Sequence, residues 1–169
     1  DPFASLNPRL KIEQTLGEPL FIHGLCKTWN EARSKIAATL EHVGMDPKIM
    51  SRHPHEFSGG QRQRIGIARV MILQPKLVIA DEAVSALDVS IQAQVLNLIK
   101  KLQRDSGMSM LFISHDLGVV RHISDRVAVM LAGKIVEIGD KHQIFEAPQH
   151  EYTRKLLNSI PRIAIGKEA

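Results

Sequence analysis

The sequence predicts an α/β fold: a parallel sheet with helices on its faces, preceded by a helical region. Residues 77–80 and 110–113 are short, continuous apolar runs, which is typical of strands covered on both faces. Between them Ile91, Val95, Leu98 and Leu102 repeat at helical spacing, and Gly107 ends the run. Strands that alternate with a helix in this way favour parallel pairing.

Residues 1–56 are predicted to be helical and connective. Thr28 and Glu31 have the spacing of a capping box at a helix start. The apolar residues that follow recur on one helix face up to Gly44, namely Ala32, Ile36, Leu40 and Val43. Prolines divide the rest of this region into short pieces.

After the second strand, the pattern predicts a hairpin and a helical tail. Residues 127–131 and 135–138 are apolar, and a turn at 132–134 separates them. From Asp140 onward we expect two short helices, with Pro148 between them.

Composition excludes several classes of protein. The 169 residues are 44% hydrophobic and 24% charged, which suits a packed domain and not a disordered chain. No apolar run approaches membrane-span length, and the first residues are not a signal peptide, so any membrane link is expected to come through a partner. The net charge of +4 is not concentrated in one run, which favours a solvated surface over nucleic-acid binding. The single cysteine, Cys26, cannot form an internal disulfide.

A helix start at residues 57–64 has the features of an anion site. Ser58 can cap the first turn and Gln61 completes a capping box, while Gly59 and Gly60 let a ligand approach the backbone. The exposed N–H groups and the helix dipole favour an anion there. A plain capped helix after a glycine turn explains these residues equally well.

Three further side chains follow the predicted strands. Asp81 and Glu82 stand where the first strand ends; such acids can hold Mg²⁺ and orient a water, or simply cap a helix. His115 follows the second strand, where a histidine is more often structural than catalytic, and Asp116 is a candidate helix cap. His53 and His55 make a poor metal pair, so no metal beyond Mg²⁺ is predicted.

Taken together, these segments resemble the motifs of ABC ATPases. In order and spacing, residues 57–64, 81–82, 85–88 and His115 are similar to the family's signature, Walker B, D-loop and switch histidine. Phe57 and Ala83 stand where leucine and proline are usual. The resemblance implies a P-loop NTPase (RecA-like) ABC ATPase core, with an incomplete parallel sheet and a helical subdomain.

The same resemblance implies roles and cofactors, ATP and Mg²⁺. Asp81 would hold Mg²⁺, Glu82 would be the general base, and His115 would contact the γ-phosphate. The signature residues and Asp88 of the D-loop would face ATP held by a second ABC ATPase domain, arranged head to tail. The signature residues concerned are Ser58, Gly59, Gly60 and Gln61.

A subfamily is also indicated. Residues 55–61, 85–94 and 148–157 resemble oligopeptide and dipeptide importers, and 81–88 resemble the glutathione-import ATPase, although Glu151 replaces a usual proline. This implies an energy-coupling ATPase for import of peptides. It would lie peripherally on the cytoplasmic face of the bacterial inner membrane, with two permease subunits and a substrate-binding protein. The transported substrate and the identity of the second ATPase stay open.

The implied division is a helical subdomain at 1–56, the rest of the ATPase core at 57–139 and a C-terminal extension at 140–169. No G-x-x-x-x-G-K-[S/T] segment occurs, so we expect a fragment that starts just after the Q-loop and cannot bind ATP alone. Two alternatives remain: an ABC-type ATPase that acts on DNA, and a non-hydrolysing regulatory module.

Overall fold

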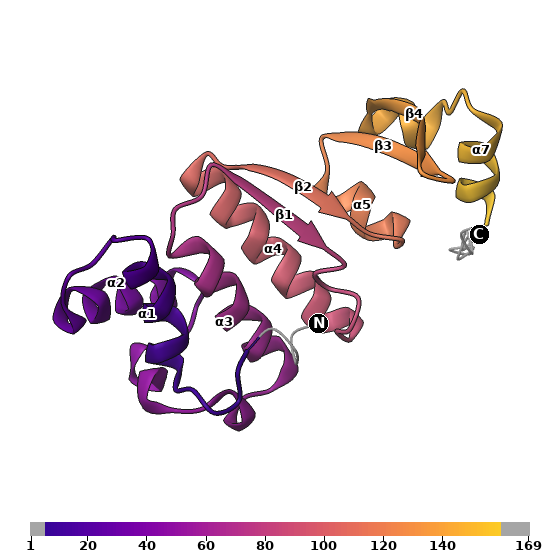
Figure 1. The fold of residues 1–169 in the computed structure, drawn as a ribbon. Coiled ribbons are helices and arrows are strands. Elements are labelled where there is room, and N and C mark those ends of the chain that lie inside the picture. Colours follow the sequence, from indigo (N-terminus) through magenta and orange to yellow (C-terminus); the bar gives the residue numbers. More distant parts are fainter. Residues whose placement is uncertain (1–5, 160–169) are drawn as a thin grey trace. The chain divides into compact units, whose positions relative to one another are not determined.

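The computed structural model describes residues 6–159 of the chain. They belong to two compact units, of which the first ends at Ile113 and the second begins at Ser114. Within the described residues, the first unit carries a helical region followed by two strands, and the second carries a β-hairpin with short helices (Figure 1).

The helical region contains helices α1 (Ile12–Ile22) and α2 (Trp29–His42), then the 3₁₀ helices η1 (Pro47–Ser51) and η2 (Pro54–Glu56). The predicted cap is present, because the Thr28 hydroxyl accepts a hydrogen bond from the Glu31 N–H at 3.3 Å. The Glu31 carboxylate, however, accepts from the Lys27 N–H at 2.9 Å. Gly44 has a φ of 74°, a conformation that favours glycine, and lies just beyond the end of α2 as predicted.

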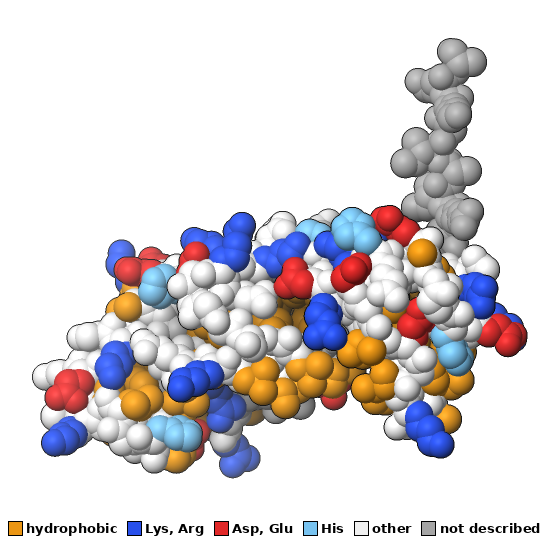
Figure 2. All heavy atoms as spheres, turned by 90° about the horizontal axis from the view of Figure 1, so that it is seen from above, with side chains coloured by type: hydrophobic (Ala, Val, Ile, Leu, Met, Phe, Trp, Pro, Cys, Tyr) orange, Lys and Arg blue, Asp and Glu red, His pale blue; other side chains and the backbone are white. Residues whose placement is uncertain are grey.

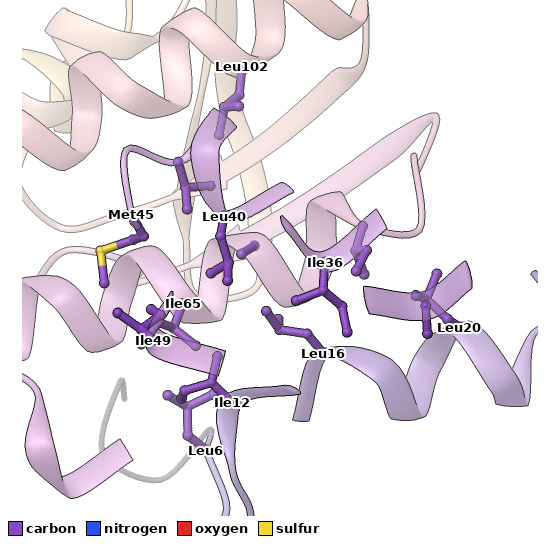
Figure 3. Close-up of a cluster of buried hydrophobic side chains, with 14 of the residues drawn as sticks. Leu6, Ile12, Leu16, Leu20, Ile36, Leu40, Met45, Ile49, Ile65 and Leu102 are labelled. Atoms are coloured by element: carbon purple, nitrogen blue, oxygen red, sulfur yellow. The ribbon is translucent and has the colours of Figure 1, made fainter. Parts of the chain in front are cut away.

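One apolar core joins this helical region to helices α3 (Gly59–Met71) and α4 (Val89–Ser106). Figure 3 shows side chains from α1, α2, η1, α3 and α4 that meet in it; fully or almost fully buried members are Ile12, Leu16, Leu20, Ile36, Leu40, Ile65 and Leu102. Burial of one such side chain is worth about 1.5–3 kcal/mol. The helical region and α3 therefore share one stabilising core.

Strands β1 (Leu77–Asp81) and β2 (Ser109–Ile113) pair in parallel, with Leu77 opposite Ser109 and Asp81 opposite Ile113. Helix α4 makes the crossover between them. Gly107 ends this helix in the left-handed conformation, with a φ of 67°. The predicted parallel pairing is confirmed.

The prediction that both faces of these strands are covered is wrong for the described residues. Val78 and Met110 pack against the core on one face. The side chains on the other face are exposed: Leu77 by 57%, Ile79 by 64%, Leu111 by 53% and Ile113 by 45%. The continuous apolar run indicates that both faces of the strands are apolar, but a second layer of structure is needed to bury the second face. Exposed hydrophobic side chains are visible in the space-filling view (Figure 2).

In the second unit, helix α5 (Leu117–Ile123) precedes the antiparallel strands β3 (Arg126–Leu131) and β4 (Lys134–Asp140). Their turn residues Ala132 and Gly133 have φ angles of 48° and 78°, as a two-residue hairpin requires. Helices α6 (Lys141–Glu146) and α7 (Glu151–Asn158) follow. The predicted hairpin and two-helix tail are confirmed.

No helix within residues 6–159 has both the length and the apolar character needed to cross a membrane. The functional division at 1–56, 57–139 and 140–169 stays a prediction, and its two ends, 1–5 and 160–169, lie outside the described residues.

Candidate functional site

The start of α3 is a reciprocal capping box, as predicted. The Ser58 hydroxyl accepts from the Gln61 N–H at 3.3 Å, and the Gln61 side-chain oxygen accepts from the Ser58 N–H at 3.0 Å. Both residues are exposed. The N-terminal, positive end of the α3 dipole therefore lies at the surface, next to the two glycines.

The two glycines of this turn differ in their surroundings. A Cβ at Gly60 would lie 2.5 Å from Cγ2 of Ile91 in α4, whereas a Cβ at Gly59 would come no closer than 3.9 Å, to Cδ2 of Leu87. Gly60 is thus required for close packing of α3 against α4, a reason that the sequence did not reveal. Gly59 leaves room beside the backbone.

The carboxylate pair lies at the carboxyl end of β1. Asp81 is the last residue of the strand and is exposed. Glu82 is half-buried and adopts a left-handed backbone conformation, with a φ of 51°. Its N–H donates to the Ile113 carbonyl at 3.0 Å, and its own carbonyl accepts from the Ser85 N–H at 3.2 Å and hydroxyl at 2.9 Å. The backbone of Glu82 is therefore held on both sides.

Gln63, in the second turn of α3, contacts this segment directly. Its side-chain amide donates to the carbonyl oxygen of Ala83 at 2.7 Å. Sequence reasoning placed Gln63 in the signature segment 57–64 but gave it no role of its own. The available signal was an amide side chain on a helix that is otherwise packed by Ile65 and Ala68.

The predicted D-loop aspartate, Asp88, caps α4. Its carboxylate accepts from the Ile91 N–H at 3.0 Å, and the residue is exposed. This capping role is independent of any contact with a second subunit.

His115 belongs to the second unit, whereas the other predicted site residues belong to the first. It is exposed and precedes the confirmed cap Asp116, whose carboxylate accepts from the Gly118 N–H at 2.8 Å and the Val119 N–H at 3.2 Å. A local cap therefore fixes the chain direction just after the histidine.

Residues 6–159 contain no group of three or more His, Cys, Asp or Glu side chains that could hold a metal ion by themselves. The rings of His53 and His55 stack on each other, with centroids 5.6 Å apart.

The second unit holds a buried carboxylate that the sequence did not single out. Glu137 on β4 is 9% exposed and accepts from the backbone N–H of Gln149 at 2.7 Å and of His150 at 3.1 Å. Burial by itself would raise the pKa of this carboxyl. The nearby Thr153 hydroxyl, which lies outside strict hydrogen-bond geometry, and the two N–H donors outweigh burial and lower the pKa.

Comparison with known proteins decides the family. The model of the ABC transporter family matches residues 2–85, and that of the oligopeptide/dipeptide transporter C-terminal region matches residues 136–169. The chain belongs to the ABC transporter family. The predicted family and fold class, a P-loop ABC ATPase core, are confirmed.

Relatives of this ABC chain include proteins named for glutathione import and for oligopeptide transport. It is 58% identical over 161 residues to the glutathione import ATP-binding protein GsiA of Pectobacterium atrosepticum, and 56% identical over 161 residues to the oligopeptide transport ATP-binding protein AppF of Bacillus subtilis. Both alignments cover 95% of the chain, which spans 26% of GsiA and 49% of AppF.

Among solved structures, cbiO1 from Clostridium perfringens, part of the ABC transporter complex cbiONQ, superposes with a TM-score of 0.76 at 26% identity. The match covers 96% of this ABC chain and 62% of cbiO1.

Proposed function

We propose that this chain is part of the ATP-hydrolysing, energy-coupling subunit of an ABC importer for peptides, with oligopeptides, dipeptides or glutathione as the substrate class. One combination carries the proposal. The capped signature turn and the strand-end carboxylates occur in the same chain as a C-terminal region of the oligopeptide/dipeptide transporter type. The names of GsiA and AppF support the substrate class.

In the proposed mechanism, Asp81 and Glu82 have different roles at the end of β1. Mg²⁺ usually takes one or two carboxylates and completes its shell with phosphate oxygens and water, so the exposed Asp81 suits it as a carboxylate ligand. Bound there, Mg²⁺ would neutralise charge on the ATP phosphates. Glu82 acts as the general base that orients and deprotonates the attacking water. Its doubly held backbone supports this role, because a base must be positioned to work.

The signature turn is proposed to serve the ATP of a second ABC ATPase domain, arranged head to tail. Ser58 and Gln61 are exposed at the positive end of α3, and Gly59 has open space beside it. Asp88 contributes from the D-loop, and His115 contacts the γ-phosphate.

The helical subdomain at 1–56 transmits closure and reopening to two permease subunits, the core part at 57–139 carries the chemistry, and the extension at 140–169 is of the peptide-importer type. A substrate-binding protein delivers the cargo. The subunit works peripherally at the cytoplasmic face of the bacterial inner membrane.

ATP hydrolysis by the full-length subunit tests this proposal. Glu82→Gln is expected to lower turnover by roughly 10²–10⁴-fold while ATP binding persists, because the substitution removes a general base and keeps its size. The matched control is Glu151→Gln, at an exposed position of α7, which is expected to leave turnover unchanged. Near-normal turnover of Glu82→Gln would contradict the role of Glu82.

The 169-residue chain on its own is expected not to bind Mg-ATP, because it contains no G-x-x-x-x-G-K-[S/T] segment to hold the β- and γ-phosphates. A calorimetric titration measures this directly. Stoichiometric binding would show that these 169 residues hold nucleotide by another route.

A further inference from the structure

The Gln63–Ala83 hydrogen bond joins two segments that are 20 residues apart in sequence. Gln63 lies on α3, five residues after Ser58, and its amide reaches the carbonyl of Ala83 at 2.7 Å in a partly buried position. Ala83 follows Glu82 directly. The bond therefore runs from the signature helix to the peptide unit beside the proposed general base.

Glu82 needs support from its surroundings. A glutamate with a φ of 51° is in a sparsely populated conformation, which persists only where neighbouring structure holds it. The support from Ile113 comes through β2, and that from Ser85 comes from the same turn. The hydrogen bond from the Gln63 amide on α3 gives the Glu82–Ala83 turn a further support.

One packing contact accompanies this hydrogen bond. A Cβ at Gly60 would lie 2.5 Å from Cγ2 of Ile91, so the backbone of Gly60 lies close to that side chain. The start of α3 thus meets the segment from Ala83 to Ile91 at two points: Gly60 with Ile91, and Gln63 with Ala83. Because packed elements of this kind resist independent displacement, we expect the signature turn and the Glu82–Ala83 turn to move together.

We propose that Gln63 is a positioning residue that holds the Glu82–Ala83 turn to the signature helix. Through it, displacement of the signature turn by the partner's ATP shifts Glu82 within its own subunit. This inference rests on the proposed function. Gln63 touches neither nucleotide nor water in this role and acts only through the Ala83 carbonyl.

Gln63→Met in the full-length subunit tests this link, because methionine keeps the length of the side chain and removes the donor. Without nucleotide, backbone amides within residues 82–87 are expected to exchange about 10-fold faster. With ATP, kcat is expected to fall about 10-fold while KM changes less than about 2-fold, since the base is misplaced and binding is not. Gln94→Met, at an exposed position of α4, is the matched control and is expected to change neither value.

Gln63→Glu tests the same hydrogen bond through its dependence on pH. A glutamate side chain donates to the Ala83 carbonyl only when protonated, and the facing carbonyl oxygen favours that form. Turnover relative to the native subunit is therefore expected to rise as the pH is lowered from about 8 to about 6.

Native amide exchange and native kcat in Gln63→Met would overturn the inference. Absence of hydrolysis by the unmodified subunit would instead overturn the proposed function, and amide exchange without nucleotide would still decide whether Gln63 holds the turn.

Discussion

Glu137 and His150, thirteen residues apart, are joined by a hydrogen bond of 3.1 Å from the His150 N–H to the Glu137 carboxylate. The other carboxylate oxygen accepts from the Gln149 N–H at 2.7 Å. His150 is also the cap of α7, where its ring Nδ1 accepts from the Tyr152 N–H at 3.1 Å. A single acid on β4 thus fixes the chain just before the last described helix.

Replacement of Glu137 by alanine is expected to release this connection. Two partly buried N–H groups lose their charged acceptor, which costs about 1–3 kcal/mol of local stability. Amide exchange at Gln149, His150 and Tyr152 measures the effect. Glu151→Ala is the control, because its ion pair with Lys155 is exposed and worth little. Unchanged protection in Glu137→Ala would show that packing alone holds α7.

The same carboxylate predicts a dependence on pH. Its pKa is lowered in the folded state, so its stabilising contribution is complete above the ordinary carboxyl pKa and is lost as the pH falls through the lower folded value. Protection of the Gln149 and His150 amides is therefore expected to fall below about pH 4. Glu137→Gln should remove this dependence. An acid transition that survives in Glu137→Gln would assign it to another group.

Gly60→Ala is expected to destabilise the first unit by about 1–3 kcal/mol, because the new methyl overlaps Ile91 and α4 must shift. Denaturant unfolding measures the loss. The double variant Gly60→Ala/Ile91→Ala should recover part of it, since the overlapping atoms are gone. Gly59→Ala, with open space, is the matched control. Equal losses at both glycines would contradict the packing explanation.

Gly107→Ala tests the end of α4. Nothing lies within 4 Å of a Cβ at this position, so the cost comes from the φ of 67° alone and is expected to be about 1 kcal/mol. Gly107→Asn should cost less, because asparagine tolerates the left-handed region better. Thermal unfolding ranks the stability of the native chain and the two variants. An alanine variant as stable as the native chain would contradict the claim that the left-handed conformation at residue 107 favours glycine.

One-sided burial of the β1–β2 pair predicts unequal tolerance in the 169-residue chain. Leu111→Thr, on the exposed face, is expected to change the free energy of unfolding by less than about 0.5 kcal/mol. Met110→Thr, on the face packed against the core, should cost about 1–3 kcal/mol. Comparable losses at the two positions would show that the second face is buried after all.

Local chemistry made much of this structure predictable. Helix ends are set by residues that are close in sequence: Ser58 with Gln61 caps the start of α3, Asp116 caps the start of α5, and Gly107 ends α4. Their roles therefore follow from spacing alone. Parallel pairing followed from two apolar runs with a helix between them. Burial was less predictable, because Ile79 and Leu111 have the same apolar character whether or not a second layer covers them.

By itself, the sequence determined the order of helices and strands, their caps, and the motif spacing that is typical of the ABC transporter family, because each of these depends on neighbours along the chain. Only the tertiary structure decided that Gln63 holds Ala83, that Gly60 makes room for Ile91 and that Glu137 binds the start of α7. These contacts join segments 12 or more residues apart, and their partners are selected by the packing of whole elements, which no local pattern encodes.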